Sequence, residues 1–461
     1  MAQPQVLQQK WDLTGSMAPF MDVHMVGPLL DFLREVELYD PKVITKEKIK
    51  LLSKTNMVDL EEEEYIRHKD DASFAAEYEV QRPLLEKRRN EVFDRIDNEP
   101  EAVKLVTEFF SDADRISDLK AQANLTSEYL ASHHGITTDA LETYYKFSKF
   151  KYECGIYSEA EEMLVNYLSI VQPSSASVLG ALWGRLVCRI LQAKWEDSLA
   201  DLQAVKEAID ARNVSHVDQI RQRAWLLHWG LFVYMNQRDS HEMLADFFSE
   251  KHYLQTMENL CPWLLRYYTA AVVLSPSRRR TGIRDLLTEI QNMGYLYADP
   301  ITQFLESLYT QFDFDAAQLK LKECQQLMRQ DFFLQIFQDK FTHEARVLIC
   351  EMYCTINRRV DLTMLSEKLQ LTEEESERWM VDMVRGSSAV GGGAALDAKI
   401  DSSGKQVLMS PPSRTATQQV VERTRDFTHR SNMLASTVGG VLKDQTVFLR
   451  TQGGSKGRPT R

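Results

Sequence analysis

The sequence lacks any apolar run typical of a membrane span. The longest stretch without Lys, Arg, Asp or Glu is 163–184, which is long enough to cross a bilayer. However, Asn166 and the turn sequence 172–175 divide it into two short apolar pieces, which predicts two helices joined by a turn. Residues 1–30 include Lys10 and Asp12 and contain no continuous apolar core of a secretory signal. We therefore expect a protein without membrane contact.

Motifs for catalysis and metal binding are scarce. The six cysteines form no C-x-x-C pair, no H-E-x-x-H is present, and the only Gly-Lys pair, Gly404-Lys405, lacks phosphate-loop spacing. His343, Cys350 and Cys354 could share a helix face as zinc ligands, but no fourth ligand is near, so we prefer ordinary core thiols. We expect no catalytic residue, no metal site, no cofactor and no small-molecule substrate. The cysteine usage is typical of the cytosol or nucleus.

An excess of positive charge is also missing. Lys and Arg number 55 against 67 Asp and Glu, and the formal net charge of −12 argues against nucleic-acid binding over the whole surface. Residues 411–461 nevertheless carry nine basic and three acidic side chains, which leaves −18 on residues 1–410. This distribution predicts an acidic body with a separate basic contact at its end, in a disordered tail over 443–461.

Apolar residues recur at spacings of three and four from Pro28 to about Phe341, which predicts an almost entirely helical region that begins at Pro28. Three segments in it share an aromatic residue, a small residue three positions later and a leucine seven positions later: 157–164, 195–202 and 314–321. The interval between the first two, from Tyr157 to Trp195, is typical of stacked helical hairpins. Chance similarity among amphipathic helices is the alternative.

These patterns divide the helical region into parts. We expect an irregular N-terminal segment over 1–27, N-terminal helical repeats over 28–215 and a second helical-repeat part over 216–340.

The sequence changes character after residue 340. An apolar helix over 341–357 precedes a short helix that begins at Asp361, and a third helix opens with a capping box from Thr372 to Glu375. A Gly-rich loop then leads to a β-hairpin whose second strand is 406–409. Helix, helix-turn-helix and hairpin together predict a winged helix over 341–410. One more helix is expected over 415–442.

The helix after the capping box decides between DNA and protein as the target of this winged helix. A helix-turn-helix protein inserts this helix into the major groove, yet here it carries five acidic residues against two basic ones. The negative charge of this helix would repel the phosphates of DNA. We therefore favour contact with protein, in which the edge of the hairpin adds to the sheet of a neighbouring subunit. A closed, inert C-terminal subdomain is the alternative.

The expected contact residues fall into two groups. The candidate wing interface consists of Leu396, Ala398, Ile400, Gln406, Val407 and Met409. The candidate helical-bundle residues are Val420, Val421, Phe427, Leu434, Val438 and Val441.

Helical repeats that run into a winged helix near the C-terminus resemble the PCI-domain family. Several strings are similar to the e subunits of translation initiation factor 3 in that family: 28–33, 55–59, 151–155, 299–302, 312–315, 377–379 and 396–401. The spacing of apolar residues and the resemblance to the PCI-domain family together predict an all-α fold. It is a right-handed α-solenoid of tetratricopeptide-like or HEAT-like hairpins that ends in a winged helix with a small β-hairpin wing, followed by a long C-terminal helix. The Gly-rich segment 386–395 and the segment 1–16 depart from the family pattern.

The resemblance implies a non-catalytic scaffold subunit of a cytoplasmic factor that binds the small ribosomal subunit and supports mRNA recruitment. PCI subunits of this family associate through their winged helices, and their C-terminal helices join in a bundle. The implied partners are the c, d and l subunits, the bundle subunits and the small ribosomal subunit, with an RNA contact by the basic tail. The first alternative is a PCI scaffold of the proteasome lid or the COP9 signalosome. The second is a winged-helix regulator that binds nucleic acid.

Overall fold

Contacts between residues divide the chain into two units, one mainly of residues up to Tyr353 and the other mainly of residues from Cys354 onward. The structure is a computed structural model, which describes residues 11–68, 71–112, 116, 119, 126–172, 175–211, 215–237, 240–369, 372–385, 398–401, 406–409, 417, 420–421, 423–425 and 427–438. The Gly-rich loop over 386–395 and the tail over 443–461 that the sequence predicts lie outside these ranges. No helix within the ranges is both long and apolar enough to cross a membrane.

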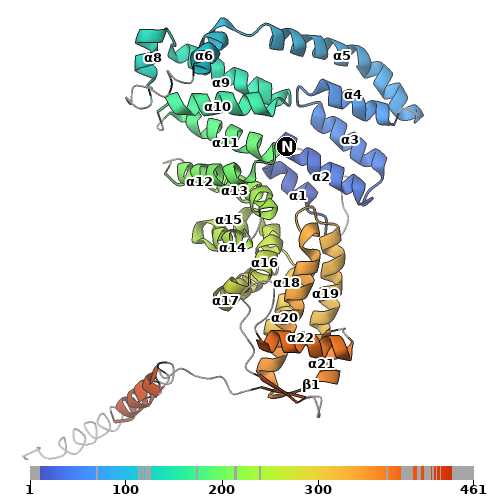
Figure 1. The fold of residues 1–461 in the computed structure, drawn as a ribbon, viewed down its shortest axis with the longest axis vertical. Coiled ribbons are helices and arrows are strands. Elements are labelled where there is room, and N and C mark those ends of the chain that lie inside the picture. Colours follow the sequence, from blue (N-terminus) through green and yellow to red (C-terminus); the bar gives the residue numbers. More distant parts are fainter. Residues whose placement is uncertain are drawn as a thin grey trace, which may run out of the picture. The chain divides into compact units, whose positions relative to one another are not determined.

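The first unit is built from helices (Figure 1). Its α-helices are α1 (Thr14–Met17), α2 (Val23–Glu35), α3 (Pro41–Leu52), α4 (Val58–Arg67), α5 (Ala72–Asp97), α6 (Glu101–Ser111), α8 (Ser127–His134), α9 (Thr138–Glu153), α10 (Tyr157–Ile170), α11 (Ala176–Leu191), α12 (Trp195–Ala211), α13 (His216–Asn236), α14 (His241–Ser249), α15 (Lys251–Leu260), α16 (Leu265–Leu274), α17 (Pro276–Met293), α18 (Pro300–Glu306), α19 (Phe314–Arg329) and α20 (Gln338–Ile356). Short 3-10 turns are η1 (Ala18–Phe20), η2 (Pro262–Leu264) and η4 (Gln335–Phe337), and a π-helical turn is η3 (Ser307–Gln311).

Successive helices pack on one another through much of this unit. Each helix from α9 to α13 contacts the next, as do those from α2 to α5, and Figure 1 shows the α9–α13 series as a stack. A helix within such a series therefore buries one face against the helix before it and another against the helix after it. This is the arrangement of an α-solenoid, in which each hairpin relies on its neighbours for a core.

The repeat interpretation is confirmed at all three segments. Their aromatic residues are the first residues of α10, α12 and α19. The small residues are completely buried: Ala160, Ser198 and Ala317. The leucines are buried as well: Leu164, Leu202 and Leu321. The small side chain thus permits the close approach of a neighbouring helix, and the leucine one turn later lies on the same packed face.

The N-terminal region differs from the expectation of an irregular segment through residue 27. From residue 14 onward it contains α1, η1 and the start of α2, which begins at Val23 rather than at Pro28. The side chain of Asp22 accepts a hydrogen bond from the backbone N–H of His24 at 2.9 Å and so caps the helix ahead of the proline. Pro28 lies inside α2, where the burial of neighbours such as Met25 and Leu29 holds the helix in place.

The second unit contains the winged helix. Its helices are α21 (Leu362–Leu369) and α22 (Glu373–Arg385), and its strands are β1 (Arg359–Asp361), β2 (Ala398–Asp401) and β3 (Gln406–Met409). The strands form an antiparallel sheet in the order β1-β3-β2, which confirms the hairpin and adds the unexpected strand β1. The capping box is also confirmed, because the amide of Thr372 donates to Glu375 Oε2 at 3.1 Å and the amide of Glu375 donates to Thr372 Oγ1 at 3.3 Å.

Candidate subunit interfaces

The backbone of β2 is unpaired along one side within the described part of the sheet. The amide of Met409 donates to the carbonyl of Arg358 at 3.0 Å, so the backbone groups of Met409 point toward β1. Along an antiparallel strand the N–H and C=O groups of successive residues point alternately to one side and the other. The preceding residue, Leu408, therefore points its backbone groups at its partner Lys399 in β2. The next residue of β2, Ile400, then turns its N–H and C=O away from the sheet. This outward donor and acceptor are suited to pair with another strand.

The predicted wing side chains occupy different environments. Val407 is completely buried opposite Val360 and Ile400, so it supports the sheet from inside. Ala398, Ile400 and Met409 are half-buried and Gln406 is exposed, whereas Leu396 lies outside the described residues.

The outer face of the sheet was missed by the sequence analysis. It carries Leu408, which is 38% exposed and lies opposite Arg359 on one side and Lys399 on the other. The alternation of side chains about Val407 was a signal that could have found it.

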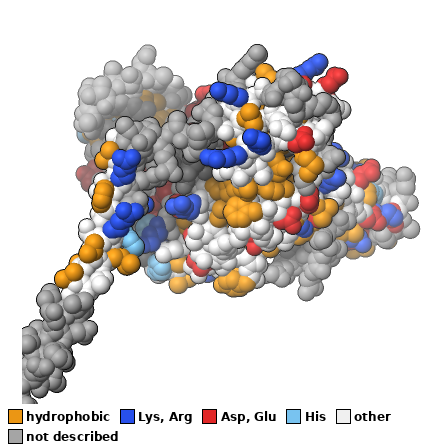
Figure 2. All heavy atoms as spheres, turned by 90° about the horizontal axis from the view of Figure 1, so that it is seen from below, with side chains coloured by type: hydrophobic (Ala, Val, Ile, Leu, Met, Phe, Trp, Pro, Cys, Tyr) orange, Lys and Arg blue, Asp and Glu red, His pale blue; other side chains and the backbone are white. Residues whose placement is uncertain are grey.

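The C-terminal helix presents large apolar side chains to solvent. Residues 420–421, 423–425 and 427–438 are helical, and Phe427 and Leu434 are 67% and 65% exposed. Val420, Phe427 and Leu434 recur every seven residues, and Val438 follows Leu434 by four, which is the spacing of a helix–helix seam. At the lower left of Figure 2 this helix shows hydrophobic side chains beside arginines. Val421 is also exposed, and Val441 lies outside the described residues.

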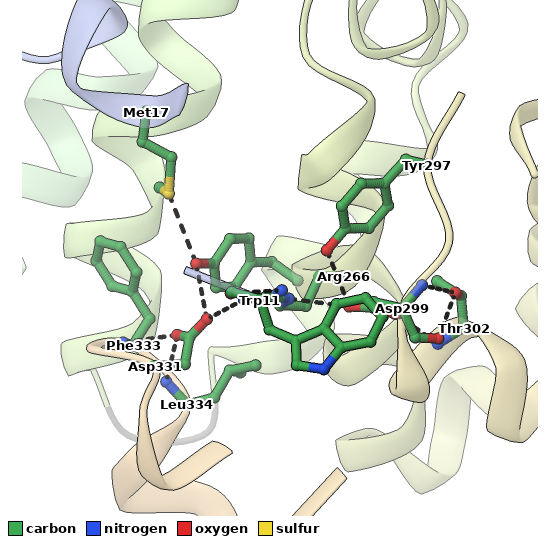
Figure 3. Close-up of polar contacts among 10 residues, drawn as sticks. Trp11, Met17, Arg266, Tyr297, Asp299, Thr302, Asp331, Phe333 and Leu334 are labelled. Carbon is green, nitrogen blue, oxygen red and sulfur yellow. Dashed lines mark hydrogen bonds and ion pairs between the residues drawn. The ribbon is translucent and has the colours of Figure 1, made fainter. Parts of the chain in front are cut away.

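A buried ionic cluster joins distant parts of the helical unit (Figure 3). The guanidinium of Arg266 in α16 donates to Asp299 Oδ2 and to Asp331 Oδ2, both at 2.9 Å, and to the carbonyl of Trp11 at 3.0 Å. All three charged side chains are at most 3% exposed. Burial acts to lower the pKa of Arg266, but the surrounding phenols and carboxylates outweigh it and raise that pKa, so the side chain stays charged.

Two tyrosines complete the cluster. Tyr267 donates its hydroxyl proton to Asp331 Oδ2 and Tyr297 donates to Asp299 Oδ2, each at 3.0 Å. Asp299 also caps α18 through the amide of Thr302 at 2.8 Å. One arginine therefore holds the N-terminal segment, α16, the start of α18 and the loop after α19 in a fixed arrangement.

The N-terminal segment is held at a second place by His228 of α13. The ring of Phe20 stacks on the His228 imidazole with 4.8 Å between centroids, and the Phe20 carbonyl accepts from Trp229 Nε1 at 3.2 Å. His228 Nε2 accepts from Trp263 Nε1 at 3.1 Å, while its Nδ1 lies 2.7 Å from the Ala224 carbonyl. Because Nε2 accepts, the ring is neutral with its proton on Nδ1. Burial lowers the pKa of His228 to about 4.

The described residues offer little that resembles a reaction centre. The cysteines are free thiols, and burial raises the pKa of Cys154 to about 11 and of Cys188 to about 12, so neither is a thiolate near neutral pH. No group of three His, Cys, Asp or Glu residues in the described ranges is arranged to hold a metal ion. Exposed apolar side chains on the C-terminal helix and outward backbone groups on β2 are, in contrast, features typical of protein-contact surfaces.

Comparison with known proteins gives consistent results. A family model described as the eIF3 subunit 6 N-terminal domain matches residues 12–151. A Caenorhabditis elegans protein, named as the E subunit of eukaryotic translation initiation factor 3, is 36% identical over 92% of this chain and 96% of its own length. Proteins of the same name from Arabidopsis thaliana and Sclerotinia sclerotiorum are each 34% identical, over 93% and 94% of this chain and 96% and 95% of their own lengths. The similarity thus includes both units.

Proposed function

Since the chain belongs to the E-subunit family of eukaryotic translation initiation factor 3, we propose that it is held in that factor through the edge of its wing and its C-terminal helix. It acts as a non-catalytic scaffold of translation initiation. The observation that carries the proposal is the C-terminal helix, whose apolar side chains are exposed in the chain alone. Its neighbours are the c, d and l subunits and those of the helical bundle, and the assembled factor meets the small ribosomal subunit in the cytoplasm.

The seam on the C-terminal helix supports a bundle with other helices. Burying a phenylalanine and a leucine contributes about 1.5–3 kcal/mol each relative to leaving them in water. A helix that pairs along Val420, Phe427 and Leu434 removes these side chains from solvent without changing the fold of the first unit. Several such moderate contacts on one subunit raise the effective concentration of the others.

We expect the double substitution Phe427→Asp and Leu434→Asp to reduce co-purification of the other initiation factor subunits by at least about tenfold, because it buries charge in the seam. The matched control is Asn432→Asp with Ser436→Asp, which adds the same charge on the opposite side of the helix, where the side chains are also exposed. Equal loss with both pairs would indicate a general charge effect. Recovery of proteasome-lid or signalosome subunits in place of initiation factor subunits would contradict the assignment to this factor.

A proline tests the sheet edge without disturbing the sheet itself. In β2 the N–H of Ala398, like that of Ile400, points outward, so Ala398→Pro removes no bond to β3. We expect the melting temperature of the free chain to stay the same and association with the neighbouring subunit to weaken about fivefold, as loss of one hydrogen bond predicts. Lys399→Pro, which removes a ladder bond to Leu408, should instead loosen the wing. Unchanged association with Ala398→Pro would exclude this edge as a contact.

A DNA-binding winged helix is the less favoured function. The helix that would enter the groove, α22, exposes Glu374 and Glu375 in its first turn, where phosphate would have to approach.

A further inference from the structure

A polar hollow lies between α19 and α20 in the first unit. Its volume is about 410 Å3, and its lining residues are Gln325, Arg329, Gln338, Asp339, Thr342, His343 and Arg346. The helices run antiparallel here, because Gln325 Nε2 donates to Thr342 Oγ1 at 3.3 Å and Arg329 Nε donates to Gln338 Oε1 at 3.4 Å. The hollow therefore continues along both helices for about two turns.

The lining carries more positive than negative charge. Arg329 and Arg346 face one carboxylate, Asp339, and neither arginine forms an ion pair with any described residue. Arg329 is exposed, but Arg346 is half-buried, and in most other parts of the unit half-buried arginines are paired, as Arg185 is with Asp201 at 2.6 Å. The N-terminus of α20 at Gln338 adds the positive end of its helix dipole to the same hollow. The site therefore has a net attraction for anions in a chain that is acidic as a whole.

The spacing of the two arginines selects the kind of anion. Arg329 is bonded to Gln338, and Arg346 lies eight residues further along α20, a separation of about 12 Å along the helix axis. Two cations separated in this way suit phosphates spaced along a strand better than one phosphate group. Between them, Gln325 has an amide group that can hydrogen-bond to sugars and base edges.

We propose that the α19–α20 hollow binds the phosphate backbone of single-stranded RNA, with Arg329 and Arg346 each contacting a different phosphate. The choice of RNA over other polyanions rests on the proposed function in translation initiation, whereas the anion site itself does not. None of the lining residues belongs to the basic tail, whose contribution to RNA binding should be independent of theirs.

The test measures fluorescence anisotropy of a short labelled oligouridylate with the full chain at several salt concentrations. We expect Arg329→Gln and Arg346→Gln each to weaken binding about threefold to tenfold and to lower the slope of log affinity against log salt by about one. Arg346→Lys, which keeps the charge, should retain the wild-type slope. The control is Lys87→Gln, which removes a charge from the exposed surface of α5 and should leave binding unchanged.

Three results would overturn the inference: wild-type affinity in both arginine variants, an equal loss with Lys87→Gln, or displacement of the RNA by a singly phosphorylated peptide at equal phosphate concentration. Circular dichroism and melting temperature identify a variant that fails to fold, and the other arginine variant then provides the comparison with the wild type. Co-purification with initiation factor subunits is measured on the same variants. If the variants assemble normally but bind RNA like the wild type, the RNA site is wrong while the scaffold function stands.

Discussion

Replacing Arg266 by Met is expected to lower the free energy of unfolding by about 3–5 kcal/mol. The substitution leaves Asp299 and Asp331 buried at no more than 3% exposure, without the cation that both contact at 2.9 Å. Removing one member of a buried ionic cluster costs far more than removing a surface pair, because the remaining charges keep their desolvation penalty. Urea unfolding followed by circular dichroism measures the change.

Arg223→Met is the matched control for this prediction. Arg223 is also nearly buried, but its partner Asp210 is 38% exposed and can be solvated when the arginine is lost, so we expect a smaller loss of about 1–2 kcal/mol. Adding Asp331→Asn to Arg266→Met should restore part of the lost stability, since it removes one of the unpaired charges. Equal destabilisation by Arg266→Met and Arg223→Met would mean that the cluster is no more important than an ordinary ion pair.

Acid is expected to destabilise the wild-type chain through His228, by about 3 kcal/mol between pH 7 and pH 4. The folded pKa is lowered to about 4 by burial, whereas the unfolded chain takes up the proton near 6.5. The stabilisation is therefore fully present above pH 6.5 and is lost as the pH falls through the folded pKa. Geometry gives a second reason, because a proton on Nε2 would face the N–H of Trp263 at 3.1 Å.

The variant His228→Phe tests this contribution. It should be less stable than the wild type at pH 7, because it loses the bonds to Trp263 and Ala224, but the difference should shrink steadily from pH 6.5 to pH 4. Comparing the two proteins at each pH cancels the titration of all other groups. A difference that is constant over this range would show that His228 does not titrate with unfolding.

Local sequence patterns predicted those parts of the fold that depend on neighbouring residues. The capping box at Thr372 and the hairpin ending at Met409 involve residues that are close in the chain, so their spacing was sufficient. The repeat was also detectable, because Ala160 and its equivalents must be small wherever two helices approach closely. The family resemblance then identified the order of these elements as that of a PCI protein.

Contacts between distant residues could not be predicted in the same way. Arg266 meets Asp299 and Asp331 across 33 and 65 residues, and nothing in the local pattern at Arg266 distinguishes it from a surface arginine. Strand β1 has only three residues, and it can be recognised as a strand only from its pairing with β3. Val407 was predicted to lie at the interface because subunits of the resembling family associate through their winged helices, and only the pairing with Val360 identifies it as core.

The attachment of the N-terminal segment also affects how the protein is made. Phe20 and Trp11 bond to residues 209 and 255 positions later. At roughly 5–20 residues per second, the ribosome needs on the order of tens of seconds after synthesising Trp11 before Arg266 and Asp331 emerge. During that interval Met17 and Phe20 lack their final partners. Residues 11–20 are thus buried only long after they are synthesised, which makes nascent chains of this protein candidates for chaperone binding until most of the helical unit is complete.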